Sequence, residues 1–264
     1  MTRGPRTITL LTDFGLHDAY AGIMHGVIAS IAPRARVIDL CHEVQPFQIH
    51  QARFLLRQSW PYFPQGSIHV CVIDPGVGAA RRPLCVQAAG HLFIGPDNGL
   101  FSDQLALQGA RVRAITNPQF MLPHVSQTFH GRDIFAPAAA HLAAGVPPSR
   151  LGKLIHDATR LATGGPVRIG RRFWLGEVAH IDRFGNVITN LDAAEFLPLA
   201  PKGLQLKIGF ETLRRRASSY AEAPEGELFV IAGSSGTLEV SMKEASAAKK
   251  LGVAVGAPVE LEVW

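Results

Sequence analysis

The sequence is short of cysteine and has no long apolar run, and each shortage excludes a class of protein. Only three cysteines occur among 264 residues, at Cys41, Cys71 and Cys85, and none has CxxC spacing. An odd number without that spacing argues against a disulfide framework or a zinc site and favours a reducing cytoplasm. No apolar stretch approaches the length that a membrane span requires, so we expect a soluble protein with no membrane partner.

The sequence also lacks the signals of metal and nucleic-acid binding. It contains no HExxH motif, no EF-hand loop and no pair of histidines at ligand spacing, so we expect no metal and no other cofactor. The net charge is +5, but the basic residues are scattered, and the densest run is the three arginines at 214–216. We therefore assign most of this charge to solvated surface and expect no nucleic-acid partner.

What is present is the composition of a folded globular protein, with 47% hydrophobic and 18% charged residues. In the first half, short β-rich runs alternate with helical periodicity. Strands are expected at residues 7–11, 37–40 and 67–73, and helices at residues 19–31 and around 49–60. Asp18 precedes the first of these helices as its expected N-cap. This alternation predicts a layered α/β domain.

The second half has a different pattern. Proline and glycine cluster between residues 145 and 170, which predicts a boundary between a first domain at 1–165 and a second at 171–264. Beyond this boundary, short strands separated by turns are expected at residues 174–181, 187–190, 204–210, 228–231, 236–242 and 259–263. Such a succession predicts an all-β domain, either a small barrel or a sandwich.

Two acidic residues follow strands of the first domain. Ligands in open α/β sheets bind beyond the carboxyl ends of strands, so Asp13 is placed to bind a sugar diol, or alternatively to cap a turn. Asp74 follows a fully apolar strand, where a carboxylate needs a partner or a cleft, and Arg81 could pair with it. A phosphate-binding loop is the competing interpretation, but the GxxxxGK[ST] pattern and its lysine are missing.

A histidine lies at the expected entrance of a helix. Pro137 belongs in the first turn of that helix, which places His130 near the helix N-terminus. The positive end of the helix dipole favours a neutral imidazole, which suits His130 to hydrogen-bond a water or hydroxide. The alternative is a structural histidine whose hydrogen-bonding groups are satisfied by the core or by Asp133.

Two loops carry further polar candidates. Asn98 lies in the turn GPDNG, which is a turn under either a structural or a functional interpretation. The loop at residues 182–186 needs only its Gly-Asn pair to turn, so Asp182 and Phe184 suggest a site for a nucleobase, although a plain turn is equally compatible with the spacing.

Taken together and in order, these segments closely resemble the S-adenosyl-L-methionine (SAM) hydroxide adenosyltransferase family, which is related to the SAM-dependent fluorinase and chlorinase. The resemblance covers most of the chain, in ITLLTDFGLHDAY (8–20), VIDLCHEVQPF (37–47), VIDPGVGAARR (72–82), GPDNGL (95–100), SQTFHGRDIFAP (126–137), GEVAHIDRFGNVITN (176–190) and GTLEV (236–240). It implies an N-terminal α/β domain joined to a C-terminal β-barrel. It also implies a homotrimer that binds SAM between the first domain of one subunit and the barrel of its neighbour.

The resemblance also implies roles for individual residues. Asp74, Arg81 and His130 match the family's water-activating set, which the related halogenases lack. Contacts to SAM are implied at Asp13, Phe47, Asp182, Asn186, Ser234, Glu239 and Met242. The segments themselves add Asp18, Asn98, Phe129 and Phe184 as candidate substrate-binding residues. The chain departs from the family at Gly233, where asparagine is common, and at residues 241–246.

The function implied by this resemblance is hydrolysis of SAM to adenosine and L-methionine, by attack of water or hydroxide at ribose C5′. A SAM-dependent halogenase is one alternative, because the superfamily includes such enzymes. A non-catalytic sensor of SAM or adenosine is another, and a nucleic-acid-binding protein with a basic barrel is the third.

Overall fold

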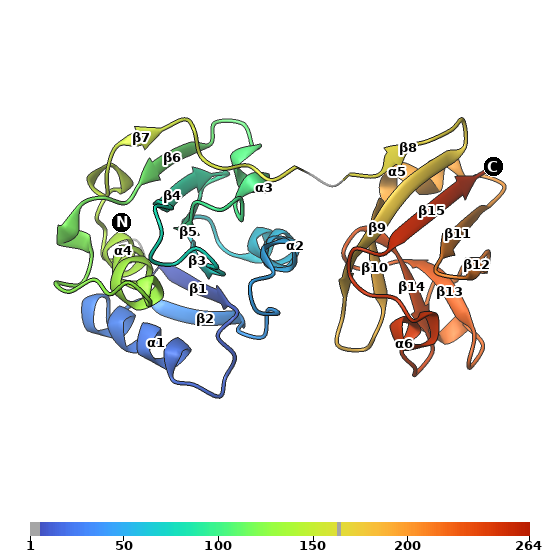
Figure 1. Cartoon of the computed structure of the whole chain (residues 1–264), viewed down its shortest axis with the longest axis horizontal. Coiled ribbons are helices and arrows are strands. Elements are labelled where there is room, and N and C mark those ends of the chain that lie inside the picture. Colours follow the sequence, from blue (N-terminus) through green and yellow to red (C-terminus); the bar gives the residue numbers. More distant parts are fainter. Residues whose placement is uncertain (1–5, 163–164) are drawn as a thin grey trace. The chain divides into compact units, whose positions relative to one another are not determined.

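The computed structural model describes residues 6–162 and 165–264. Internal contacts divide the chain into two compact units, Met1–Thr163 and Gly164–Trp264 (Figure 1). The predicted first domain, 1–165, includes residues 1–5 and 163–164, which lie outside the described residues. Within the described ranges, no helix is both long and apolar enough to cross a membrane.

The first unit is built on a seven-stranded mixed sheet with the strand order β2-β1-β3-β5-β4-β6-β7. Strands β2, β1, β3 and β5 pair in parallel, whereas β4, β6 and β7 add an antiparallel edge. The strands are β1 (Thr7–Thr12), β2 (Arg36–Cys41), β3 (Ile68–Val72), β4 (Pro83–Ala88), β5 (His91–Pro96), β6 (Arg111–Ala114) and β7 (Leu154–Ile155). The helices are α1 (Tyr20–Ile31), α2 (Ile49–Ser59), α3 (Ser102–Leu105) and α4 (Ala136–Ala143), with short 3-10 turns at Trp60–Tyr62, Pro118–Phe120 and Pro148–Arg150.

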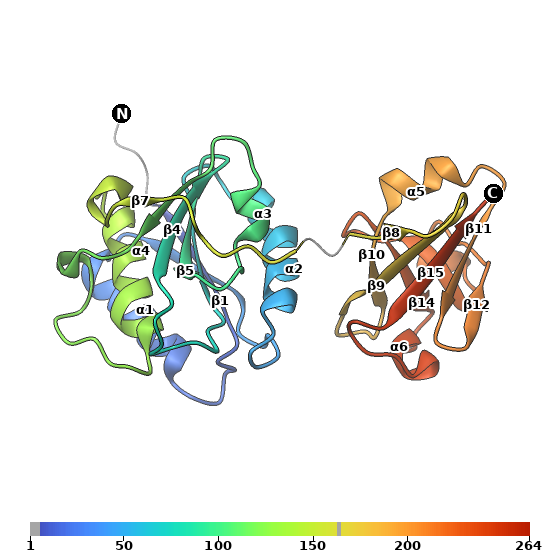
Figure 2. The same cartoon turned by 45° about the horizontal axis from the view of Figure 1, so that its top comes forward.

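Helices cover both faces of this sheet, α1 and α4 on one side and α2 and α3 on the other (Figures 1 and 2). Alternate residues of a strand face opposite sides, so Ile8 and Leu10 pack in the α1/α4 core while Leu11 packs in the core beneath α2. Strand β3 divides in the same way and is buried at every position. The predicted layered α/β domain is therefore confirmed, and its central strands are apolar because both faces are covered.

Two local predictions about helices have different outcomes. Helix α1 begins at Tyr20, but its N-cap is Ala19 and no side chain caps it, so the prediction that Asp18 is the N-cap is wrong. Asp18 lies one residue too early and is exposed. Pro137 does lie in the first turn of α4, as predicted. A π-helix, η3 (Gly131–Phe135), precedes α4, and its N-cap is His130. Short π-helical turns of this kind are frequent at functional sites.

The second unit is an eight-stranded sheet with the order β12-β11-β15-β9-β10-β14-β13 and β8 paired to β9. Its edge strands β12 and β13 contact each other, so the sheet curls nearly into a barrel around its main apolar core. The strands are β8 (Val167–Arg168), β9 (Phe173–Ile181), β10 (Val187–Asp192), β11 (Leu204–Ile208), β12 (Glu211–Leu213), β13 (Leu228–Ala232), β14 (Thr237–Met242) and β15 (Pro258–Val263).

The predicted C-terminal β-barrel domain is confirmed, and two short helices accompany its strands. Helices α5 (Ala193–Leu199) and α6 (Ala247–Leu251) lie at opposite ends of the barrel (Figure 2), and a 3-10 turn spans Tyr220–Glu222. Each α-helix has a side-chain cap, because Asp192 accepts from two N–H groups of α5 and Ser246 accepts from the backbone of Lys249 in α6. Both capping residues are of types that favour helix starts, but the helices are too short to show periodicity in the sequence.

Candidate functional site

Two neighbouring parallel strands end side by side and present two carboxylates. Thr12 of β1 pairs in register with Val72 of β3. Asp13 and Asp74 follow shortly after these positions, so both lie at the carboxyl edge of the sheet, as the sequence predicted. Partial burial raises the pKa of Asp13, and the charge of Asp74 adds to that shift, although backbone hydrogen bonds oppose it.

The loop after β3 returns to the same edge and completes a connected set of three side chains. Arg81 donates from Nε to Oδ1 of Asp74 at 3.0 Å, and its Nη2 binds the other carboxylate oxygen. The same Nη2 lies 2.6 Å from Nδ1 of His130. The side chains of Arg81 and Asp74 are 9% and 6% exposed, so this pair is shielded from solvent. The residues predicted as catalytic are thus in contact with one another.

The contact with Arg81 determines the state of His130. A guanidinium can only donate, so Nδ1 must offer its lone pair and the neutral ring carries its hydrogen on Nε2. Burial lowers the pKa of His130, and the positive charge of Arg81 lowers it further, against the opposing effect of Asp74. Asp133 does not bind this ring, because it pairs with Arg132 and accepts from the backbone N–H of Ser126. The alternative of a structural His130–Asp133 pair is therefore wrong.

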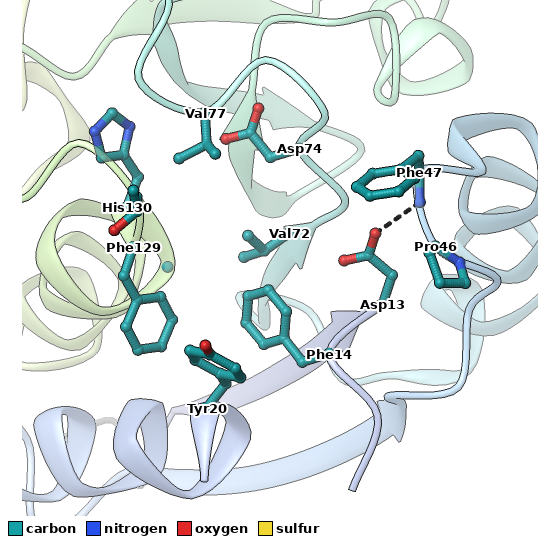
Figure 3. Close-up of a pocket in the computed structure, with 12 residues that line it drawn as sticks. Asp13, Phe14, Tyr20, Pro46, Phe47, Val72, Asp74, Val77, Phe129 and His130 are labelled. Atoms are coloured by element: carbon teal, nitrogen blue, oxygen red, sulfur yellow. Dashed lines mark hydrogen bonds between the residues drawn. The ribbon is translucent and has the colours of Figure 1, made fainter. Parts of the chain in front are cut away.

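A cavity of about 420 Å³ opens beside these groups (Figure 3). Its lining comes from the loops after β1 and β3, the loop before α2 and the entrance of η3, namely Asp13, Phe14, Tyr20, Pro46, Phe47, Val72, Asp74, Val77, Thr128, Phe129, His130 and Gly131. Phe14, Tyr20 and Phe129 contact one another through their rings and form an apolar wall. A cavity of this size with few polar groups fits a small organic ligand.

Phe47 has an unusual backbone conformation next to Asp13. Its φ is +68°, a region that a bulky side chain rarely adopts, and its N–H donates to Oδ2 of Asp13 at 2.9 Å. The ring remains 67% exposed and lies at the mouth of the cavity, near Asp13 (Figure 3). An exposed aromatic ring held in a strained conformation is typical of a ligand-binding position.

The second unit contains its own cavity, of about 790 Å³. Its lining includes five of the predicted SAM-binding residues. They lie on the β9–β10 loop, on the β13–β14 loop and at the end of β14, and are Asp182, Phe184, Asn186, Ser234 and Met242. Asp182 organises the loop by accepting from the backbone of Phe184 and Asn186, and from the Asn186 side chain at 2.9 Å. Phe184 is left 77% exposed on this cavity.

Sequence reasoning missed several polar residues of the second cavity, namely Tyr220, Lys243, Glu244 and Ser246. Tyr220 lines it and donates to Oε1 of the buried Glu239 at 2.5 Å, while Nδ2 of Asn186 lies 3.5 Å from the Tyr220 hydroxyl. Burial and, next, the bond to Glu239 raise the pKa of Tyr220 to about 12. No motif surrounds Tyr220 in the sequence, so only the fold reveals its partners.

Three predicted substrate-binding residues lie outside the linings of both cavities. Asp18 is exposed on the segment before α1. Asn98 donates to the carbonyl of Ile73 and accepts from Leu100, so it braces the end of β3 rather than facing the first cavity. Glu239 is 5% exposed and acts through Tyr220 and Ser241. Asn98 and Glu239 therefore hold neighbouring groups in place rather than line a cavity.

Comparison with known proteins agrees with this architecture. Residues 8–152 match the SAM hydroxide adenosyltransferase N-terminal domain, and residues 176–260 match the C-terminal domain of that family. A solved structure described as an uncharacterized conserved protein from Thermotoga maritima superposes with a TM-score of 0.91 at 34% identity, covering 96% of this chain and 99% of that one.

Named relatives fall into two groups. The (R)-S-adenosyl-L-methionine hydrolase of Thermus thermophilus is 39% identical over 97% of this chain and 99% of its own length. The protein of the same name from Methanocaldococcus jannaschii is 34% identical, with 93% and 92% covered. A fluorinase from Nocardia brasiliensis is only 24% identical, over 99% of both chains. From the two matched domains and these full-length relatives, the chain belongs to the SAM hydroxide adenosyltransferase family.

Proposed function

We propose that this protein hydrolyses SAM to adenosine and L-methionine, with the (R) sulfonium form as its substrate. The observation that carries the proposal is the contact chain from Asp74 through Arg81 to His130, beside a cavity lined by aromatic rings. The name (R)-S-adenosyl-L-methionine hydrolase, borne by relatives at 34% to 39% identity, supports both the reaction and the configuration.

The chemistry needs an oriented nucleophile rather than an acid. The water oxygen forms a bond to C5′ while the C5′–S bond breaks, and the bonding electron pair stays on sulfur. Methionine therefore leaves with a neutral thioether, and no proton has to be supplied to it. Holding water in line with the C5′–S bond removes much of the entropic cost of the attack. The scheme uses neither a metal nor another cofactor.

The hydrogen bond from Arg81 to His130 decides which of the three residues takes the proton from water. Because Nδ1 accepts from Arg81, that nitrogen is not free to take a proton from water. Arg81 and His130 hold the water or hydroxide, and the positive charge of Arg81 favours the ionised form. Asp74 receives the proton, since a carboxylate has about four lone-pair sites and Arg81 occupies two of them.

The first cavity holds the ribose end of the substrate in this proposal. Asp13 accepts hydrogen bonds from the ribose hydroxyls, and the exposed ring of Phe47 packs against the nucleoside. The wall of Phe14, Tyr20 and Phe129 excludes bulk water from the reacting atoms, which strengthens the electrostatic contacts there.

The second cavity holds the adenine and the methionine part. Asn186 offers an amide that can bind the adenine edge, Phe184 offers an exposed ring, and Asp182, Ser234 and Met242 lie around the methionine. We propose, from the family resemblance, that the protein is a homotrimer in which the barrel of a neighbouring subunit supplies this half of the site. Neither cavity alone carries both the water-activating set and the base-binding loop, which supports a shared site.

We also propose that the reaction takes place in the cytoplasm. Cys41, Cys71 and Cys85 are all free thiols. The absence of a disulfide among these cysteines, all of which are described, agrees with a reducing compartment.

The proposal is tested by incubating the purified protein with (R)-SAM or (S)-SAM and separating the products by chromatography. We expect equal amounts of adenosine and methionine from the (R) form, at a higher rate than from the (S) form. Addition of fluoride or chloride should give no 5′-halo-adenosine, which distinguishes a hydrolase from a halogenase. Binding of SAM without any product would instead identify a sensor and contradict the proposal.

A further inference from the structure

A cluster of metal-ligand side chains lies apart from the cavity. His25 on α1 and Asp39 on β2 are joined by a 2.8 Å contact between Nε2 and Oδ1. Nε2 of His42, just beyond β2, lies 3.1 Å from the same oxygen. The three ligand atoms all lie within 4.8 Å of one another. The cluster has no sequence motif, because the fold brings α1 against the end of β2, and so the motif search that predicted no metal could not detect it.

The buried nitrogen of His42 is the observation that points to a ligand. Its side chain is 3% exposed, and Nε2 has no hydrogen-bond partner among the described residues. Although Asp39 is close, the geometry falls outside that of a hydrogen bond, so a buried polar atom is left unsatisfied. Native proteins rarely leave a buried polar atom in this state, and coordination of a cation would give the nitrogen a partner.

The other side of the His42 ring is held in the orientation that metal binding requires. Nδ1 of His42 lies 2.8 Å from Oγ1 of Thr12, a residue that is fully buried. When Nδ1 donates to that hydroxyl, Nε2 keeps its lone pair free for a ligand, 3.1 Å from Oδ1 of Asp39. An outer hydrogen bond of this kind fixes the tautomer and the orientation of metal-binding histidines.

We propose that His25, Asp39 and His42 bind one divalent transition-metal ion of the zinc class. Two imidazole nitrogens and one carboxylate suit Zn²⁺ or Co²⁺ better than Mg²⁺ or Ca²⁺, which prefer oxygen ligands. Ligand atoms about 2.0–2.2 Å from a tetrahedral zinc lie about 3.3–3.5 Å apart, so the observed 2.8 and 3.1 Å require only a small outward movement. The side chains of His25 and Asp39 are 36% and 45% exposed, which leaves a position open for water.

The ion would have a structural role, separate from the proposed hydrolysis. It would join α1 to β2, and the carbonyl of His42 accepts from Gly15 in the loop that carries Asp13. An ion that binds the folded state alone stabilises that state by RT ln(1 + [L]/Kd), where [L] is the concentration of free ion. The ion is thus expected to stabilise the first unit and the β1–α1 loop.

The test uses the full chain without an affinity tag, stripped of metal with EDTA and titrated with Co²⁺ while the visible d–d absorption is recorded. We expect one Co²⁺ per chain, displaced by Zn²⁺, and a rise in Tm of about 5 °C or more at a Zn²⁺ concentration about 100-fold above the Kd. His25→Ala and Asp39→Asn should abolish the Co²⁺ spectrum and the Tm shift. His50→Ala, which removes an exposed histidine outside the cluster, should retain both.

Substoichiometric Co²⁺ binding by the parent protein would overturn the proposal. Equal Co²⁺ affinity in the parent, His25→Ala and Asp39→Asn proteins would overturn it as well. Because His25 and Asp39 are partly exposed, the metal-free variants should keep the Tm of the metal-free parent. No SAM is used in the titration, so its outcome is independent of the proposed hydrolase activity.

Discussion

Nη2 of Arg81 lies 2.6 Å from Nδ1 of His130, and this contact joins the loop after β3 to the entrance of the π-helix η3. The same guanidinium binds both oxygens of Asp74. One arginine therefore sets the position of a carboxylate and the tautomer of an imidazole. The water-activating role proposed for these residues depends on that bridging geometry.

Replacing Arg81 by lysine tests the bridge. A lysine ammonium keeps the charge but cannot bind a carboxylate in a bidentate manner while also reaching His130. We expect Arg81→Lys to lower kcat for SAM hydrolysis by about 100-fold or more, with adenosine affinity changed by less than about 3-fold. Arg171→Lys, at an exposed position of the second unit, is the matched control. Turnover close to that of the parent would show that the bridge is not used.

The pH dependence of kcat tests the neutral state of His130. Protonation would place two positive groups against each other at the 2.6 Å contact with Arg81. Burial and Arg81 lower the pKa of His130, so the ring stays neutral from high pH down to below the ordinary value of about 6.5. We expect kcat to be level near neutral pH and to fall only below that value. A fall in kcat toward acid that is centred above about pH 6.5 would contradict a neutral His130.

The first unit could be predicted from sequence because its central strands are buried on both faces. The run at β3 is apolar at nearly every position, and such runs leave few alternatives to a covered sheet. The position of Asp13 at the carboxyl edge of the sheet also followed from the rule that ligands bind at the carboxyl ends of strands. The contact between Arg81 and His130 does not follow from any such rule, because the course of the loop after β3 leaves no periodic pattern in the sequence.

Other features depend on contacts that no local pattern encodes. The left-handed conformation of Phe47 is not signalled by its residue type, since phenylalanine normally avoids positive φ. Tyr220 gains its role from Glu239, which belongs to a strand further along the chain. The antiparallel edge formed by β4, β6 and β7 likewise arises from pairing between distant segments.

Truncation of Phe47 tests its role as a nucleoside contact. The ring is 67% exposed and contributes little to the core, so Phe47→Ala should change the free energy of unfolding by no more than about 0.5 kcal/mol. Loss of its packing surface should raise KM for SAM by about 10-fold, equivalent to about 1.4 kcal/mol. Phe210→Ala, which removes a fully exposed ring in the second unit, should leave KM unchanged. A large loss of Tm without a change in KM would assign Phe47 a purely structural role.

Removal of the Tyr220 hydroxyl tests the second cavity. Tyr220→Phe leaves the buried Glu239 without its short hydrogen bond and removes a polar group near Asn186. Because the hydroxyl lines the cavity beside Asn186, KM should rise by about 10-fold, equivalent to about 1.4 kcal/mol, while kcat changes by less than about 3-fold. Tyr62→Phe, at an 84% exposed position, provides the comparison. A fall in kcat alone would place Tyr220 in the chemical step instead.

The origin of the oxygen atom in the product tests the central claim most directly. The protein is incubated with (R)-SAM in water enriched in oxygen-18, and the adenosine is analysed by mass spectrometry. Attack of water or hydroxide at C5′ predicts one labelled oxygen, located at the 5′ position, in every adenosine released, and far slower labelling with Arg81→Lys. Unlabelled adenosine, a 5′-halo product, or no turnover by the intact protein would contradict hydrolysis by the Asp74–Arg81–His130 set.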